Sequence, residues 1–209
     1  MDTQIYLIRH GETAWSLTGQ HTSRTDLPLT EHGEQQAREL GNLLRQMTFA
    51  KVLVSPMQRA RRTCELVGLD AAARVEPNLS EWNYGDYEGR TPAQIRAEHP
   101  GWDIYRDGAP GGESAEQVSA RVDLVLAELC QDGGSGPVAI FSHGQFLRAL
   151  AVRWIDLPIR QGSHLGLDTG SLSILGFEHN NIEARAIVRW NVVSNDLFAL
   201  VPRQPGSPR

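Results

Sequence analysis

Two strand-like segments of the sequence end in the same pair of residues, a histidine followed by a glycine. The first is the apolar run at residues 5–8, which continues into Arg9-His10-Gly11. The second is the run at residues 138–141, which continues into Ser142-His143-Gly144. In α/β proteins, functional side chains gather beyond the carboxyl ends of the strands. The pattern therefore predicts that two strands deliver two histidines and an arginine to one edge of a sheet.

The rest of the chain alternates between helix and strand patterns. Thr30 begins a helix with the spacing of a capping arrangement, and Ser55-Pro56 is a helix start signal with serine as N-cap. The polar segment at residues 15–30 is long for a simple connection and is a candidate binding loop. Further helices are predicted at residues 91–98, 114–130 and 144–154, and further strands at 52–54, 172–177 and 184–190, the last two joined by a turn at His179-Asn180-Asn181.

This alternation predicts an α/β fold with three layers, α/β/α, around a mainly parallel sheet with an antiparallel edge. With 209 residues and 40% hydrophobic residues, the chain can bury one substantial core. We expect one domain over residues 1–201 and a disordered tail at 202–209, which is rich in proline and glycine.

The charge and cysteine content limit the partners and the compartment. A net charge of -5 disfavours nucleic acid or an anionic membrane as a partner, because both need a basic face. The chain starts without a basic segment followed by an apolar one, and no apolar window is long enough to span a membrane. Cys64 and Cys130 are not closely spaced, and we expect both to be small core residues. These features predict a cytoplasmic protein.

Several further short motifs follow one another in a fixed order along the chain. They are Leu27-Pro28-Leu29-Thr30 with Gly33, Ser55-Pro56 with Arg59-Ala60 and Thr63, Glu81 with Gly85 and Glu88-Gly89, and Gly112-Glu113-Ser114. With Arg9-His10-Gly11-Glu12-Thr13 and Ser142-His143-Gly144, this set resembles the histidine phosphatase superfamily, which includes cofactor-dependent phosphoglycerate mutases and small-molecule phosphatases. The resemblance covers residues 5–177 and implies a phosphoglycerate mutase-like fold.

The resemblance also implies roles for five residues. His10 is the nucleophile that becomes phosphorylated, Arg9 and Arg59 hold the phosphoryl oxygens, and His143 stabilises the developing charge. Glu81 is the proton donor to the leaving group. No metal ion and no cofactor are implied.

Some of these assignments have alternatives. Arg59 also suits an anion site because it lies in the first turns of a predicted helix, whereas Arg61 and Arg62 lie on other sides of that helix and cover the surface. Glu12 and Glu88 are weaker candidates for the acid and more typical of residues that stabilise the loops.

The mutases of the family carry a longer, more basic insertion after the acid-bearing segment. Here residues 90–112 are short and contain Arg90, Arg96 and Arg106, so water can reach the pocket and hydrolysis is favoured. The runs at residues 81–89, 102–108 and 167–170 most resemble the sedoheptulose bisphosphatase branch, which implies a small phosphorylated sugar or sugar bisphosphate as substrate.

Five residues beside the histidine motifs are candidates for substrate binding. Ser16 and Ser23 replace the asparagine and glycine usual in the mutases, and the other three offer hydrogen-bond donors: His21, Thr22 and Gln145. Trp82 and Tyr84 suit either stacking on a sugar face or filling the edge of a core.

Two other functions stay open from the sequence. One is a cofactor-dependent phosphoglycerate mutase, and the other is a non-catalytic protein that binds a phosphorylated ligand. The remaining histidines lack the spacing of metal ligands. We expect His32 at a helix start, His179 in a turn, and His99 and His164 exposed. The oligomeric state is not predicted.

Overall fold

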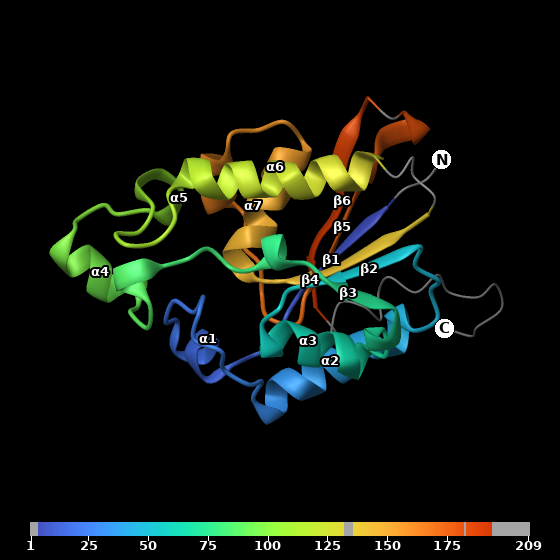
Figure 1. The fold of residues 1–209 in the computed structure, drawn as a ribbon, viewed down its shortest axis with the longest axis horizontal. Helices are drawn as coiled ribbons and strands as arrows, with labels where there is room; N and C mark the ends of the chain where they lie inside the picture. Colours follow the sequence, from blue (N-terminus) through green and yellow to red (C-terminus); the bar gives the residue numbers. More distant parts are fainter. Residues whose placement is uncertain (1–3, 132–135, 182, 194–209) are drawn as a thin grey trace, which may run out of the picture.

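The computed structural model describes residues 4–131, 136–181 and 183–193. Within them, six strands form one sheet in the order β3-β2-β4-β1-β5-β6 (Figure 1). The first four in this order are mutually parallel, and β5 and β6 are antiparallel to their neighbours. The mainly parallel sheet with an antiparallel edge is therefore confirmed. The strands are β1 (Ile5–Arg9), β2 (Lys51–Val54), β3 (Ala73–Val75), β4 (Val138–Ser142), β5 (Leu172–Phe177) and β6 (Arg185–Val192).

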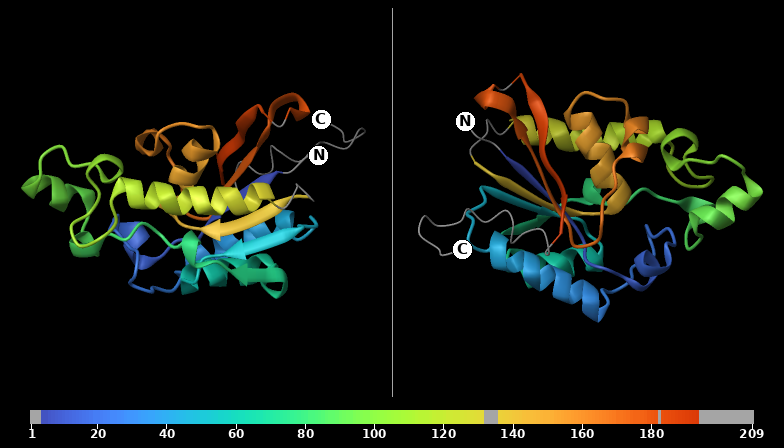
Figure 2. Two further views of the ribbon diagram at one scale, coloured as in Figure 1. Left: turned by 45° about the horizontal axis from the view of Figure 1, so that its top comes forward. Right: turned by 180° about the vertical axis from the view of Figure 1, so that it is seen from behind.

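Helices cover both faces of this sheet. Alternate residues of a strand point to opposite faces, so Ile8 packs with Leu40 on one side while Leu7 packs with Val122 and Leu150 on the other. Helices α2 and α3 therefore lie on one face and α6 and α7 on the other, which completes the predicted three layers (Figures 1 and 2). These helices are α2 (Glu31–Leu44), α3 (Gln58–Val67), α6 (Ala115–Gln131) and α7 (Gly144–Trp154).

The two predicted helix starts have different outcomes. Helix α2 begins after Thr30, whose side chain accepts a hydrogen bond from the N–H of Gly33, as predicted. The predicted N-cap Ser55 is wrong, because α3 begins at Gln58 and Met57 is its N-cap residue. The Ser55 hydroxyl instead contacts the imidazole of His143. The Ser55 hydroxyl, which the sequence suggested as a helix cap, thus forms a contact between the residues that follow β2 and β4.

Three short helices lie beyond the end of the sheet at which β1 and β4 finish. Helices α4 (Pro92–Glu98) and α5 (Ile104–Asp107) project there, and α1 lies nearby (Figures 1 and 2). The predicted loop at 15–30 overlaps this helix, α1 (Ala14–Thr18), which Thr13 and Ser16 stabilise with a capping box. Short 3-10 helices occur at Asp70–Ala72, Pro77–Leu79, Gly85–Tyr87, Ile159–His164 and Glu178–Asn180.

The cysteine prediction is confirmed for one residue and wrong for the other. Cys64 is buried against the sheet, and burial raises the pKa of its thiol to about 12. Cys130 is exposed, because Leu126 and Leu129 occupy the inward side of α6 in this turn. The tail predicted at 202–209 lies outside the described residues. Among those that are described, no helix is long and apolar enough to cross a membrane.

Candidate active site

The register between β1 and β4 brings the two histidine motifs together. Arg9 lies opposite Ser142 in this parallel pair, and the N–H of His10 donates to the Ser142 carbonyl at 3.0 Å. The imidazole rings of His10 and His143 are 5.1 Å apart between centroids. The two strands therefore deliver both histidines to one point on the sheet edge, as the sequence predicts.

The imidazole of His10 is held in one orientation. Its Nδ1 lies 2.7 Å from the carbonyl oxygen of Gly11, and a carbonyl can only accept, so Nδ1 carries the proton and donates. The N–H of Gly11 in turn donates to the Thr63 hydroxyl at 3.1 Å. Burial, reinforced by the charges of Arg59 and Arg9, holds the pKa of His10 well below its ordinary value. The ring is therefore neutral near pH 7, with a lone pair on Nε2.

His143 is also buried and neutral, with the opposite tautomer. The Arg59 Nε donates to its Nδ1 at 3.2 Å, so its proton is on Nε2, which donates to the Ser55 hydroxyl at 2.7 Å. Burial is the main reason that the pKa of His143 lies well below its ordinary value, and the charge of Arg59 adds to it. Both ring nitrogens of His143 thus have partners within the protein.

Arg59 is completely buried and supports the loop at residues 22–25. Its terminal nitrogens donate to the backbone carbonyls of Thr22, Ser23 and Thr25 at 3.1–3.3 Å. The carboxylate of Glu88 accepts from the backbone N–H groups of Ser23 and Thr25 on the same loop. Arg59 therefore holds the carbonyl groups of the loop at residues 22–25, and Glu88 holds two of its N–H groups. This position of Glu88 agrees with the loop-stabilising role predicted for it.

The carboxylate of Glu81 lies at the N-terminus of α7. It accepts hydrogen bonds from the backbone N–H groups of Trp82, Gln145 and Phe146 at 2.9–3.0 Å. Helix N-termini have free N–H groups and attract negative charge, so this site fits a carboxylate. Arg121 holds the backbone at Glu81, because its guanidinium donates to the Glu81 carbonyl and pairs with the carboxylate of Glu113.

A cavity of about 170 Å³ lies at this sheet edge. The predicted residues that line it are Arg9, His10, Ser16, His21, Thr22, Glu81 and Gln145. Arg59, His143 and Ser23 do not line it. Five further residues line it: Thr13, Gly19, Gln20, Tyr84 and Pro92. Of these, only Tyr84 was considered for substrate contact from the sequence.

The aromatic residues divide between core and cavity. Trp82 is fully buried and its indole N–H donates to the Glu113 carbonyl, so it fills the core. The ring of Tyr84 lines the cavity and stacks on His21 with centroids 4.2 Å apart. Burial lowers the pKa of His21 to about 4, so this wall of the cavity is neutral. Of the two residues considered for stacking on a substrate, Tyr84 is the one that a ligand in this cavity can reach.

The two predicted serines also differ. Ser16 lines the cavity, although its hydroxyl also donates to the Thr13 carbonyl and caps α1. Ser23 is buried, and its hydroxyl donates to Glu88 and accepts from the N–H of Tyr84. The Ser23 side chain therefore ties three loop segments together.

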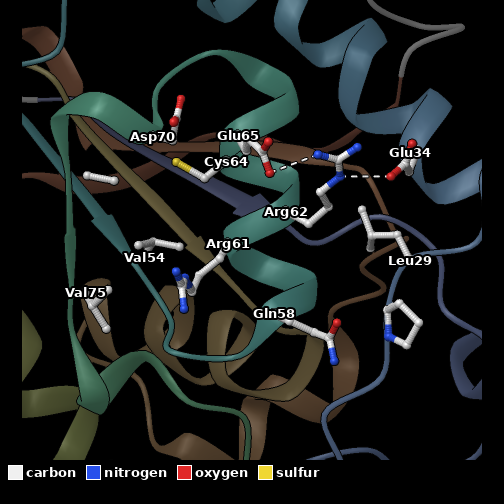
Figure 3. A pocket seen from close by; sticks show the side chains of 12 residues that line it. Leu29, Glu34, Val54, Gln58, Arg61, Arg62, Cys64, Glu65, Asp70 and Val75 are labelled. Atoms are coloured by element: carbon white, nitrogen blue, oxygen red, sulfur yellow. Dashed lines mark hydrogen bonds and ion pairs between the residues drawn. The ribbon is translucent and has the colours of Figure 1, made fainter.

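A larger hollow of about 730 Å³ lies elsewhere, between α3 and strands β2 and β3 (Figure 3). None of the predicted site residues lines it. Arg62 on its rim lies between Glu34 and Glu65 and pairs with both, which confirms a surface role for this arginine (Figure 3). Within the described part of the chain, no group of three or more histidine, cysteine, aspartate or glutamate side chains is arranged to hold a metal ion.

A neutral buried histidine, an arginine and a carboxylate around one small cavity are groups that suit an enzyme acting on a phosphorylated substrate. The α/β fold places them at the carboxyl ends of its central strands, where enzymes of this class bind their ligands.

The chain matches the model of the histidine phosphatase superfamily (branch 1) over residues 5–192, and it belongs to this family. An acid phosphatase of Mycobacterium tuberculosis is 42% identical over 178 residues, which cover 84% of this chain and 87% of that protein. A sedoheptulose 1,7-bisphosphatase of Saccharomyces cerevisiae is 30% identical over an alignment of 244 positions, gaps included, that covers 87% of this chain and 90% of that protein.

A solved structure of an open reading frame from Mycobacterium tuberculosis is similar to the whole fold. It is 39% identical, has a TM-score of 0.86, and the match covers 92% of this chain and 98% of that chain. The predicted family and fold are thus confirmed, and the chain is a phosphoric monoester hydrolase.

Proposed function

We propose that this protein hydrolyses a small phosphate monoester, with a phosphorylated sugar as the leading class, through a phosphohistidine on His10 and without a metal ion. The observation that carries the proposal is the fixed tautomer of His10. Its Nδ1 proton is bound to the Gly11 carbonyl, so the lone pair on Nε2 is available at a cavity that Arg9 and Glu81 also line.

The first half-reaction transfers the phosphoryl group to His10. Nε2 of His10 attacks phosphorus and the bond from phosphorus to the ester oxygen breaks. Glu81, which enters this step in its protonated form, gives its proton to that oxygen, and its three backbone N–H donors stabilise the carboxylate that is left. Arg9 is placed to hold a phosphoryl oxygen, since its Nε is buried and has no partner among the described residues. To bind the phosphoryl group, Arg59 exchanges a bond to the Ser23 carbonyl, and His143 exchanges the bond from its Nε2–H to Ser55.

The second half-reaction returns the enzyme to its starting state. Water attacks the phosphorus of phosphohistidine, the bond from Nε2 to phosphorus breaks, and the Glu81 carboxylate takes the proton of the water. Inorganic phosphate then leaves.

Hydrolysis is favoured over mutase chemistry by the positions of three arginines. Arg90 pairs with Glu98, Arg106 pairs with Asp107, and the Arg96 Nε donates to the Trp102 carbonyl. None of the three lines the cavity. A mutase must bind a second acidic group of its substrate for as long as the phosphohistidine exists. These three arginines do not line the cavity and so cannot bind that group there. The name of the yeast relative supports a phosphorylated sugar as the substrate.

The test is phosphate release in EDTA from sugar phosphates, sugar bisphosphates, phosphoglycerates and phenyl phosphate. We expect release by the wild type and by His99→Ala, which changes an exposed histidine, and a loss of at least about a thousandfold in His10→Ala. Isomerisation of phosphoglycerate that depends on a bisphosphorylated primer, without release, would make the protein a mutase. Binding of phosphorylated compounds without either reaction would make it a ligand-binding protein.

A further inference from the structure

The side-chain amide of Gln145 is fixed by two donors. Its Oε1 accepts from the Tyr105 hydroxyl at 2.7 Å and from Nη1 of Arg148 at 2.9 Å. Because both partners donate, the oxygen of the amide must face them and the NH₂ group must point elsewhere. Among the described residues, this Nε2 has no hydrogen-bond partner and is not enclosed, and the side chain lines the cavity. The geometry thus presents two N–H donors to a ligand.

Tyr105 and Arg148 are themselves held in place. The Tyr105 ring is buried against Trp82, and the Arg148 guanidinium lies 5.2 Å from the Tyr105 ring centroid. Arg148 also donates through Nε to the Gly162 carbonyl at 2.9 Å and through Nη2 to the Ser163 carbonyl at 3.0 Å. All three nitrogens of Arg148 therefore have acceptors, and its guanidinium lies outside the cavity lining. The amide of Gln145, and not this cation, is what a ligand meets.

The residues that line the cavity include a single cation. Among its lining residues, Arg9 is the one arginine and Glu81 the one carboxylate. His10 and His21 are neutral near pH 7, since burial lowers the pKa of each. The other polar lining groups are uncharged, including Gln20, Thr22 and Gln145. A second phosphate group held against these lining residues would thus meet no second cation among them.

We propose that the cavity selects phosphate monoesters whose leaving group is uncharged and bears a hydroxyl or ether oxygen near the ester, that Gln145 donates a hydrogen bond to this oxygen, and that Tyr105 and Arg148 are its positioning residues. This inference rests on the proposed phosphatase function. It narrows the proposed class of substrates from sugar phosphates or bisphosphates to monophosphates.

The experiment compares kcat/KM for three esters in EDTA. Fructose 6-phosphate carries an uncharged hydroxylated leaving group, fructose 1,6-bisphosphate adds a second phosphate, and phenyl phosphate has no hydroxyl beside the ester. For the wild type we expect kcat/KM for fructose 6-phosphate to exceed that for the bisphosphate by at least about tenfold.

Variants then test whether Gln145 is the selecting group. In Gln145→Ala and Gln145→Glu, the ratio of kcat/KM for fructose 6-phosphate to that for phenyl phosphate should fall about fivefold to tenfold, the value of one hydrogen bond to an uncharged group. Gln145→Glu keeps an oxygen for Tyr105 and Arg148, so it separates loss of the donor from loss of packing. Tyr105→Phe should raise KM for fructose 6-phosphate about threefold with a smaller change in kcat. Gln46→Ala, at an exposed position in the turn after α2, is the matched control and should leave the ratio unchanged.

The possible results distinguish failure of this inference from failure of the proposed phosphatase function. Hydrolysis of the bisphosphate as fast as fructose 6-phosphate, or an unchanged ratio in both Gln145 variants, overturns the inference and leaves the phosphatase function standing. Absence of phosphate release from every ester by the wild type overturns both.

Discussion

The proton positions on two histidines decide what this site can do. His10 and His143 are neighbours with opposite tautomers, because one Nδ1 faces the Gly11 carbonyl and the other faces the Nε of Arg59. The first arrangement frees Nε2 of His10 for attack, and the second directs the Nε2 proton of His143 to Ser55. Single hydrogen bonds thus assign different chemistry to two identical side chains.

Replacing Ser55 tests this assignment. In Ser55→Ala, the buried Nε2–H of His143 loses its partner, which costs about 1–3 kcal/mol of folding free energy. His143 is then held only by the bond from Arg59 Nε to its Nδ1, so its ring is less firmly positioned, and we expect kcat to fall about tenfold with a smaller change in KM. Steady-state kinetics and urea unfolding measure the two effects. Ser55→Thr keeps the hydroxyl and should recover most of kcat. Full kcat in Ser55→Ala would contradict the role of Ser55.

Ser55 also shows where reading single residues from the sequence fails. Serine before proline is a strong local signal for a helix N-cap, and the sequence contains no sign that His143, 88 positions away, takes the hydroxyl instead. Tyr105 was missed for the same reason, because its contact with Gln145 joins α5 to α7. The contact of Arg148 with Gln145 is local, within one turn of α7, but the residue lies outside the recognised motifs. By contrast, His10, Glu81 and Gln145 lie next to recognisable motifs and were predicted to be in the site.

At the scale of elements, the loop after β1 and the start of α2 are in direct contact. A Cβ atom added to Gly33 would lie 2.2 Å from the carbonyl oxygen of Glu12, and one added to Gly11 would lie 2.2 Å from the carbonyl oxygen of Gly33. The Thr30 N–H also donates to the Glu12 carbonyl at 2.9 Å. This backbone contact positions the segment that carries His10 against the helix layer.

Gly33→Ala should therefore be destabilising, although alanine favours a helix. The gain in helix propensity is at most about 1 kcal/mol, whereas forcing two backbone segments apart costs about 1–3 kcal/mol and shifts the loop beside His10. We expect a lower midpoint in urea and lower kcat. Gly166→Ala is the matched control, because its added Cβ meets nothing within 4 Å, and it should change stability by less than about 0.5 kcal/mol. Equal stability of the two variants would contradict the close contact.

The elements that the sequence predicted are those with a strong pattern of their own. The central strands β1, β2 and β4 and helices α2, α6 and α7 have long apolar stripes, and all were expected near their observed positions. Strand β3 and helices α1 and α5 are only three to five residues long and were not predicted. Their structure depends on neighbours, such as the pairing of β3 with β2 at the sheet edge.

At the scale of the whole molecule, the fold buries three histidines around its site. His10, His21 and His143 are nearly inaccessible, and burial is the largest cause of the lowered pKa of each. The unfolded chain binds protons on these residues at a higher pH than the folded one. Stability is therefore fully present above the ordinary histidine pKa and is lost as the pH falls toward the folded-state values.

His21 allows a quantitative test of this pH dependence. Its pKa falls from 6.5 to about 4, with Glu88 and Arg96 as the charged groups that act on it. Lowering the pH from about 7.5 to about 5 should thus cost about 2 kcal/mol of stability through this residue alone. In His21→Phe, which keeps an aromatic ring against Tyr84, that part of the loss should disappear. Urea unfolding at both pH values measures it, with His99→Gln as the exposed control. The same pH dependence in wild type and His21→Phe would contradict the neutral buried His21.

The central claim is that His10 carries the phosphoryl group during turnover, and the most direct test is to trap that intermediate. Enzyme is mixed with a phosphate-labelled substrate in EDTA, quenched in alkali, where phosphohistidine survives, and digested for peptide mass spectrometry. We predict label on His10 that is lost on acid treatment, and none in His10→Gln. Label on another residue, or undiminished turnover by His10→Gln, would contradict the claim.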